Sequence, residues 1–126
     1  MAALSFSHAA DLINYSLRNG TNYLALFLSD PGPDATGTEV SGTGYARVAI
    51  SLGVPSTVNG KETSANTAAV NFGTAGSDWG QVGYWAIFNA ASGGQMKWYG
   101  TFSRVKNVEI NDSVTIAVGD LVVTLS

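Results

Sequence analysis

QVGYWAIFNAASGGQMKWYGTFS, residues 81–103, is the stretch that decides the fold. Its first nine residues are the most hydrophobic segment of the chain and are rich in the aromatic and branched side chains that favour β-strands. Small residues and glycines follow at 91–94, a composition typical of turns, and residues 95–103 again carry strand-forming side chains. The stretch therefore predicts an antiparallel β-hairpin.

Further strands are predicted on both sides of this hairpin. Residues 22–28, NYLALFL, are apolar at successive positions, which indicates a strand that is covered on both faces. Residues 44–52 alternate instead, so that Ala46 and Val48 share one face while Tyr45 and Arg47 share the other. The remaining signals are Asn59-Gly60, which favours a tight turn, and short apolar segments at 67–72, 114–118 and 121–125.

One helix is predicted, over residues 5–19. Ser5 or Ser7 can accept a hydrogen bond from a free amide of the first turn. Apolar residues between Ala9 and Leu17 then fall on one stripe of a helix, and Asn19-Gly20 supplies the glycine that commonly ends one. The 126 residues therefore predict a single all-β domain, residues 1–126, with this helix at its N-terminus. The spacing of the turns favours an antiparallel sandwich or small barrel of about six or seven strands.

Composition excludes several classes of function. The chain has no cysteine, so it forms neither a disulfide nor a zinc–thiolate site. Its net charge of −3 and its scattered basic residues argue against nucleic-acid binding, and its apolar runs fall short of a membrane helix. The N-terminus lacks the features of a signal peptide, so we expect the chain to be made and kept in a cytoplasm until it is assembled or released. Only 12% of the residues are charged, against about 25% in typical domains, which indicates a surface that contacts other proteins or a non-ionic ligand.

The residues give little support for catalysis or cofactor binding. The glycines at 37, 42 and 44 precede a predicted strand instead of a helix, and no P-loop lysine follows them. His8 is the only histidine, and nothing marks a nucleophile beside it. Acidic side chains at 30, 34, 39 and 78 offer a carboxylate pair or calcium ligands, but acids beside glycine and proline more often form turns. We therefore predict no enzyme activity, no cofactor and no metal.

The aromatic residues between 79 and 99 have two interpretations. Most of them, Trp85 above all, are expected to fill the core, with Tyr84 or Tyr99 on an outer face. Trp79 lies beside Asp78 in a glycine-rich loop, so we predict that it is the exposed aromatic anchor of an interface.

The order of several segments resembles a family of small virion proteins of tailed bacteriophages, which are often labelled tail fibre or structural protein. The resemblance spans about residues 20–126 and is carried by LALFLSDP (24–31), GTEVSGTGYARVAI (37–50), residues 64–94 and residues 99–125. Its most specific pieces lie within residues 39–47 and 78–94. One departure is Asn111-Asp112, where members of the family typically have Gly-Asp.

The resemblance implies a virion structural protein. Because the domain is compact and has no shaft repeat, we expect a capsid decoration (cement) protein on the capsid surface. Its expected partners are the major capsid protein and copies of itself, as a homotrimer, with no nucleic acid and no membrane. The alternatives are a tail or fibre-tip module that binds a host glycan or protein and, third, a wall hydrolase that uses the loop acids.

The Pro/Gly/Thr-rich loop at residues 29–43 is the predicted attachment site. We interpret GTEVSGTG as a mobile arm and the following strand as its anchor, so that deleting residues 36–43 would leave the isolated domain folded. The candidate interface residues are Glu39, Gly42, Gly44, Tyr45, Arg47 and Trp79.

Overall fold

The computed structural model describes residues 5–18 and 20–125. This part of the chain forms a helix α1 (Phe6–Ile13), a short π-helix η1 (Asn14–Arg18) and nine strands. The strands are β1 (Asn22–Phe27), β2 (Val48–Ile50), β3 (Ser56–Val58), β4 (Lys61–Ala65), β5 (Val70–Thr74), β6 (Gly80–Phe88), β7 (Met96–Val108), β8 (Ser113–Ile116) and β9 (Val122–Leu125). The predicted antiparallel β fold with one N-terminal helix is confirmed.

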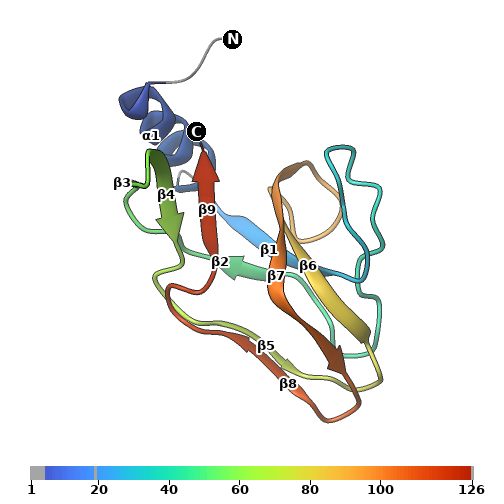
Figure 1. Ribbon diagram of the computed structural model, residues 1–126. Coiled ribbons are helices and arrows are strands. Elements are labelled where there is room, and N and C mark those ends of the chain that lie inside the picture. The colour runs from blue at the N-terminus through green and yellow to red at the C-terminus, as the bar shows by residue number, and fades with distance from the viewer. Residues whose placement is uncertain (1–4, 19, 126) are drawn as a thin grey trace.

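The strands form three antiparallel sheets, with orders β2-β1-β6-β7, β3-β4-β9 and β5-β8. The predicted hairpin of residues 81–103 is the β6–β7 pair, with Trp85 opposite Gly100 and Ile87 opposite Trp98. Figure 1 shows the β5-β8 pair across from the four-stranded sheet, and the helix beside the β3-β4-β9 sheet. The main core cluster joins residues from all three sheets, including Leu24, Val70 and Val123.

β1 has the double coverage that its sequence predicts. Leu24 and Leu26 belong to the main core, whereas Ala25 and Phe27 belong to a second cluster on the opposite face. Phe88 of the neighbouring β6 stacks on Phe27, with ring centroids 6.2 Å apart. All five side chains are buried, and on the outer face the segment around Glu39 and Arg47 covers Phe27 and Phe88.

The predicted helix is confirmed from its cap onward. Ser5 is the N-cap, and its hydroxyl accepts a hydrogen bond from the His8 amide at 3.2 Å. Ile13 and Leu17 are buried in the main core, and the side-chain amide of Asn22 donates to the Leu17 carbonyl. Asn19, which was expected to help end the helix, lies outside the described residues. Neither helical segment of the described chain is long and apolar enough to cross a membrane.

The strand predicted over residues 44–52 is the main local correction. Only residues 48–50 form a strand; Tyr45 packs inward, and Ala46 is exposed, which reverses the predicted faces at these positions. Gly44 has a φ of +85°, a conformation that an extended strand does not contain. Two further differences concern short strands. The strands β3 and β4 on either side of Asn59-Gly60 were not predicted, because their polar residues show no apolar alternation. The strand predicted over residues 67–72 lies at residues 70–74.

Gly100 allows β7 to pass across the face of Trp85. A Cβ atom at Gly100 would lie 2.5 Å from Cζ2 of that indole, so we expect Gly100→Ala to lower the free energy of unfolding by about 1–3 kcal/mol. Urea denaturation checks this value, with Thr101→Ala at the next, exposed position as the control. Equal stability of the two variants would contradict the close packing.

Candidate functional site

All six candidate interface residues lie in one connected group, where the loop after β1 meets the end of the β6–β7 hairpin. We use the name Arg47 clasp for Arg47, Glu39, Tyr45 and Phe88. Gly42, Gly44 and Trp79 lie directly beside it, since Trp79 packs edge-on against the Tyr45 ring at 5.5 Å between centroids. The sequence therefore identified residues that share one place in the fold.

Arg47 is the centre of the clasp. Its Nε and Nη2 atoms each donate to a Glu39 carboxylate oxygen at 2.9 Å, and the guanidinium lies 3.8 Å from the centroid of the Phe88 ring. Nη1 also donates to the carbonyls of Ala90 and Gly93, at 3.0 and 2.7 Å. Only 8% of the Arg47 side chain is exposed. The residue thus ties the loop after β1 to the β6–β7 turn, and Figure 1 shows these two segments side by side.

Tyr45 connects the clasp to the core. Its hydroxyl donates to Glu39 Oε2 at 2.6 Å and accepts a hydrogen bond from the Leu26 amide at 3.0 Å. The ring stacks on Phe72, 6.1 Å away, so it spans from the sheet to the β5 strand. Burial raises the pKa of the Tyr45 phenol, and the neighbouring Glu39 carboxylate raises it further, so the hydroxyl stays protonated and keeps donating.

Trp79 is buried, so the prediction of an exposed anchor is wrong. Only 3% of it is exposed, and its indole N–H donates to the Thr43 carbonyl at 3.0 Å. Gly42 lies against the ring so closely that any side chain there would overlap the indole. The loop that carries Gly42 therefore packs over the loop that carries Trp79, although the two residues are 37 positions apart in the chain.

The segment GTEVSGTG is held in place, which contradicts its interpretation as a mobile arm. The Leu28 amide donates to Thr38, and the Val40 amide donates to Leu26, so this segment extends the sheet beside β1. Val40 is only 3% exposed and belongs to the main core. Thr43 continues the attachment, since its carbonyl accepts from the Gly76 amide.

The ion pair of the clasp sets a pH dependence. Burial raises the pKa of the Glu39 carboxyl, but hydrogen bonds from Arg47 and Tyr45, together with the positive charge of Arg47, outweigh it and leave the pKa below its ordinary value of 4.5. A carboxyl whose pKa is lowered by folding contributes stability above its unfolded-state pKa, and this contribution is lost as the pH falls through the folded-state pKa.

We expect the stability difference between the wild type and Glu39→Gln to shrink as the pH falls from about 5 to about 3, because protonated Glu39 no longer gains from the ion pair. Urea denaturation at a series of pH values measures this difference. Asp34→Asn, in the same loop and exposed, controls for the loss of one negative charge. A difference that stays constant with pH would show that the carboxylate charge is not what stabilises the clasp.

The other acidic candidates have structural contacts or are exposed. Asp30 accepts a hydrogen bond from the Gly32 amide, as turn-forming acids do, whereas Asp78 accepts one from the Ile110 amide of a distant turn. Asp34 is exposed, and His8 lies in the first turn of α1. Within residues 5–18 and 20–125 no three His, Asp or Glu side chains are grouped closely enough to hold a metal ion.

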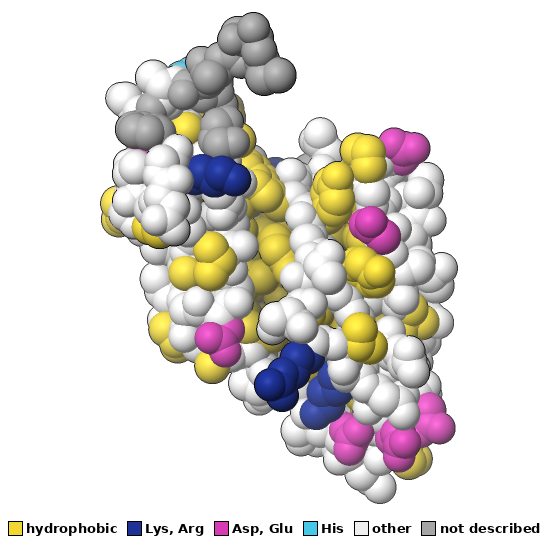
Figure 2. All heavy atoms as spheres, in the orientation of Figure 1, with side chains coloured by type: hydrophobic (Ala, Val, Ile, Leu, Met, Phe, Trp, Pro, Cys, Tyr) yellow, Lys and Arg dark blue, Asp and Glu magenta, His cyan; other side chains and the backbone are white. Residues whose placement is uncertain are grey.

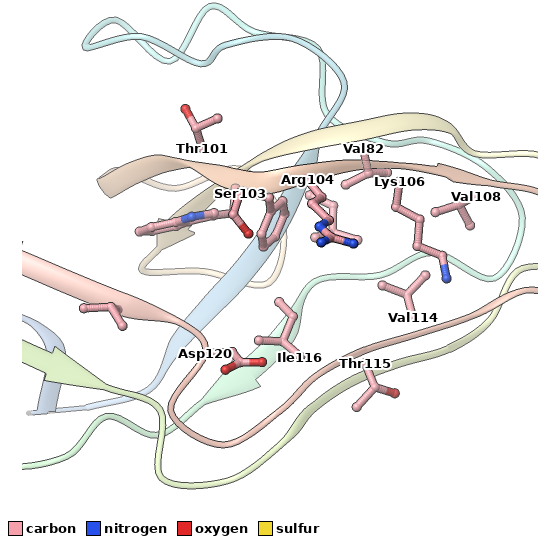
Figure 3. A pocket seen from close by; sticks show the side chains of 14 residues that line it. Val82, Thr101, Ser103, Arg104, Lys106, Val108, Val114, Thr115, Ile116 and Asp120 are labelled. Atoms are coloured by element: carbon pink, nitrogen blue, oxygen red, sulfur yellow. The ribbon is translucent and has the colours of Figure 1, made fainter.

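A groove between β7 and β8 is the surface feature that the sequence did not reveal. Its volume is about 560 Å³, and its walls include Val114 and Ile116 of β8 and Arg104 and Lys106 of β7. Figure 3 shows these four side chains pointing toward one another across the groove. Arg104 and Lys106 lie two positions apart on β7 and so share one face of the strand, and the arrangement of β7 beside β8 places that face on a groove.

Comparison with known proteins identifies the group of proteins that this chain is similar to. A family model described as Podophage GP4 fiber I protein gp80 matches residues 3–124, nearly the whole chain. No curated protein matches it.

Proposed function

Since this chain belongs to the podophage GP4 fiber I protein gp80 family, we propose that it works in the phage tail, as a fibre module that binds a glycan or protein of the host surface. The family identifies a phage virion structural protein, and its location is therefore the virion. The word fiber in the family description, matched over residues 3–124, is the observation that carries the tail assignment.

The binding face that we propose is the outer face of the four-stranded sheet. The strand register places Tyr99 opposite Ala86 and Tyr84 opposite Phe27, so both tyrosines lie on this face. Tyr99 is 41% exposed, so we propose it, in place of the buried Trp79, as the exposed aromatic anchor of the interface. Aromatic rings of this kind supply contact area at low entropic cost, and they suit uncharged ligands such as sugars.

Capsid decoration is the second candidate. The low charged fraction, 12%, supports it, because a shell protein contacts other proteins over much of its surface. The loop argument no longer does, since residues 36–43 are held in the domain. In this alternative the partner is the major capsid protein. In both we propose that copies of the chain associate, as a homotrimer, and that the protein is not an enzyme.

Immunogold electron microscopy of the parent virion tests the location. Antibody against this chain is expected to label the tail, and label spread over the head would overturn the fibre proposal in favour of decoration. Counting the particles labelled at the tail and those labelled at the head gives the fraction of virions that shows each location.

Host binding is tested by Tyr99→Ala. We expect the variant to lose at least about tenfold in affinity for host cells while its melting temperature stays unchanged, as hot-spot aromatics do. Tyr15→Ala is the matched control, since Tyr15 is 76% exposed at the helical end of the domain. Unchanged binding by Tyr99→Ala would remove this face from the proposal.

A further inference from the structure

β7 and β8 follow one another in the chain but do not pair. β7 hydrogen-bonds to β6 and β8 to β5, so both strands diverge from the turn at residues 109–112. The groove between them has an apolar floor that includes Leu26, Val82 and Trp85, which are core residues. These three side chains are buried, and the apolar surface that an occupant can reach belongs to other lining residues, Phe102, Val114, Ile116 and Val122.

The charged side chains that line the groove are two basic ones, Arg104 and Lys106, and one acidic one, Asp120. Arg104 and Lys106 are exposed on its β7 wall, and no carboxylate in the described chain lies within ion-pair distance of either. Residues 96–108 contain three basic residues and no acidic one. An occupant with an apolar centre and flanking carboxylates would match the accessible apolar lining and the basic β7 wall.

The turn beyond the groove has that composition. Ile110 is 56% exposed and lies between Glu109 and Asp112, with Asp78 beside it. We call these four residues the acidic tip. Asp78 accepts from the Ile110 amide and Asp112 accepts from the Glu109 amide, each at 2.9 Å, so the tip is already ordered before it binds. Figure 2 shows the acidic side chains gathered at this end of the molecule, beside two basic ones.

We propose that the groove of one copy binds the acidic tip of a second copy. Ile110 packs against the half-buried Val114 and Ile116, and the carboxylates of the tip face Arg104 and Lys106. This contact joins two different surfaces, and it is favoured over pairing of two β7 edges, which would bring the basic residues of both strands together. The inference rests on the proposed association of copies and names the surfaces that form it.

Sedimentation equilibrium tests the contact with single charge reversals. We expect the wild type to associate as its concentration rises, and less so at high salt, because exposed charges are screened. Lys106→Glu and Glu109→Lys are each expected to weaken association at least about tenfold. Lys61→Glu reverses a basic residue in the β3–β4 hairpin and is expected to behave as the wild type. Circular dichroism shows that each variant folds.

Mixing the two reversed variants separates this contact from the alternatives. Lys106→Glu retains an acidic tip and Glu109→Lys retains a basic groove, so the mixture is expected to associate more strongly than either variant alone. If Lys106→Glu strengthens association, the copies pair through β7 and the inference is overturned. Association that neither reversal changes also overturns it. A wild type that stays monomeric would overturn the association of copies too, whereas the tail location is decided by microscopy alone.

Discussion

Deletion of residues 36–43 is expected to leave a chain that does not fold. The deletion removes Val40 from the core and Glu39 from the clasp, and it removes the Thr43 carbonyl that accepts from Trp79 and Gly76. Loss of Glu39 alone leaves the Arg47 guanidinium buried without its counter-charge, which costs about 3–5 kcal/mol. Small domains have a total stability of only about 5–15 kcal/mol, so the combined losses approach all of it.

Circular dichroism and urea denaturation of the deleted chain measure this outcome. The matched control keeps the chain length and replaces only exposed side chains of the same segment, as Thr36→Ala and Ser41→Ala, and is expected to fold normally. A deleted chain with a cooperative transition near that of the wild type would restore the mobile-arm interpretation of this segment.

Arg47→Ala is expected to lower the free energy of unfolding by about 3–5 kcal/mol. The substitution leaves Glu39 without its charge partner, and it leaves the Ala90 and Gly93 carbonyls without their donor. It also uncovers the Phe88 ring, because the guanidinium is stacked on it. The hydrogen bonds through which Arg47 joins the loop after β1 to the β6–β7 turn would then be absent.

Arg47→Lys distinguishes a specific role of the guanidinium from a simple need for positive charge. A lysine has one ammonium group and cannot donate to the Glu39 carboxylate and the two carbonyls at once, so we expect it to recover less than half of the loss. Urea denaturation of the three proteins gives the values. Full recovery with lysine would show that charge alone stabilises the clasp.

Local patterns were sufficient where one segment determines its own structure. The β6–β7 hairpin, the two-sided burial of β1 and the Ser5 cap are each marked by the residue pattern of a single segment. The tight turn at Asn59-Gly60 is of the same kind, since both residues have a positive φ, of 51° and 77°. Period-2 patterns failed at residues 44–47, because a glycine turn there changes which side faces the core.

For the candidate site, the sequence by itself selected residues that lie together in the fold, but it did not determine their contacts. The segments around Glu39, Arg47 and Trp79 were selected as one group, and they are in contact. That Trp79 is buried, that GTEVSGTG extends the sheet and that Arg104 and Lys106 share a groove were decided only by the tertiary structure. The physical reason is that exposure and charge pairing depend on which distant segments pack together, as in the Thr43–Ser77 and Arg47–Gly93 hydrogen bonds, which join residues 34 and 46 positions apart.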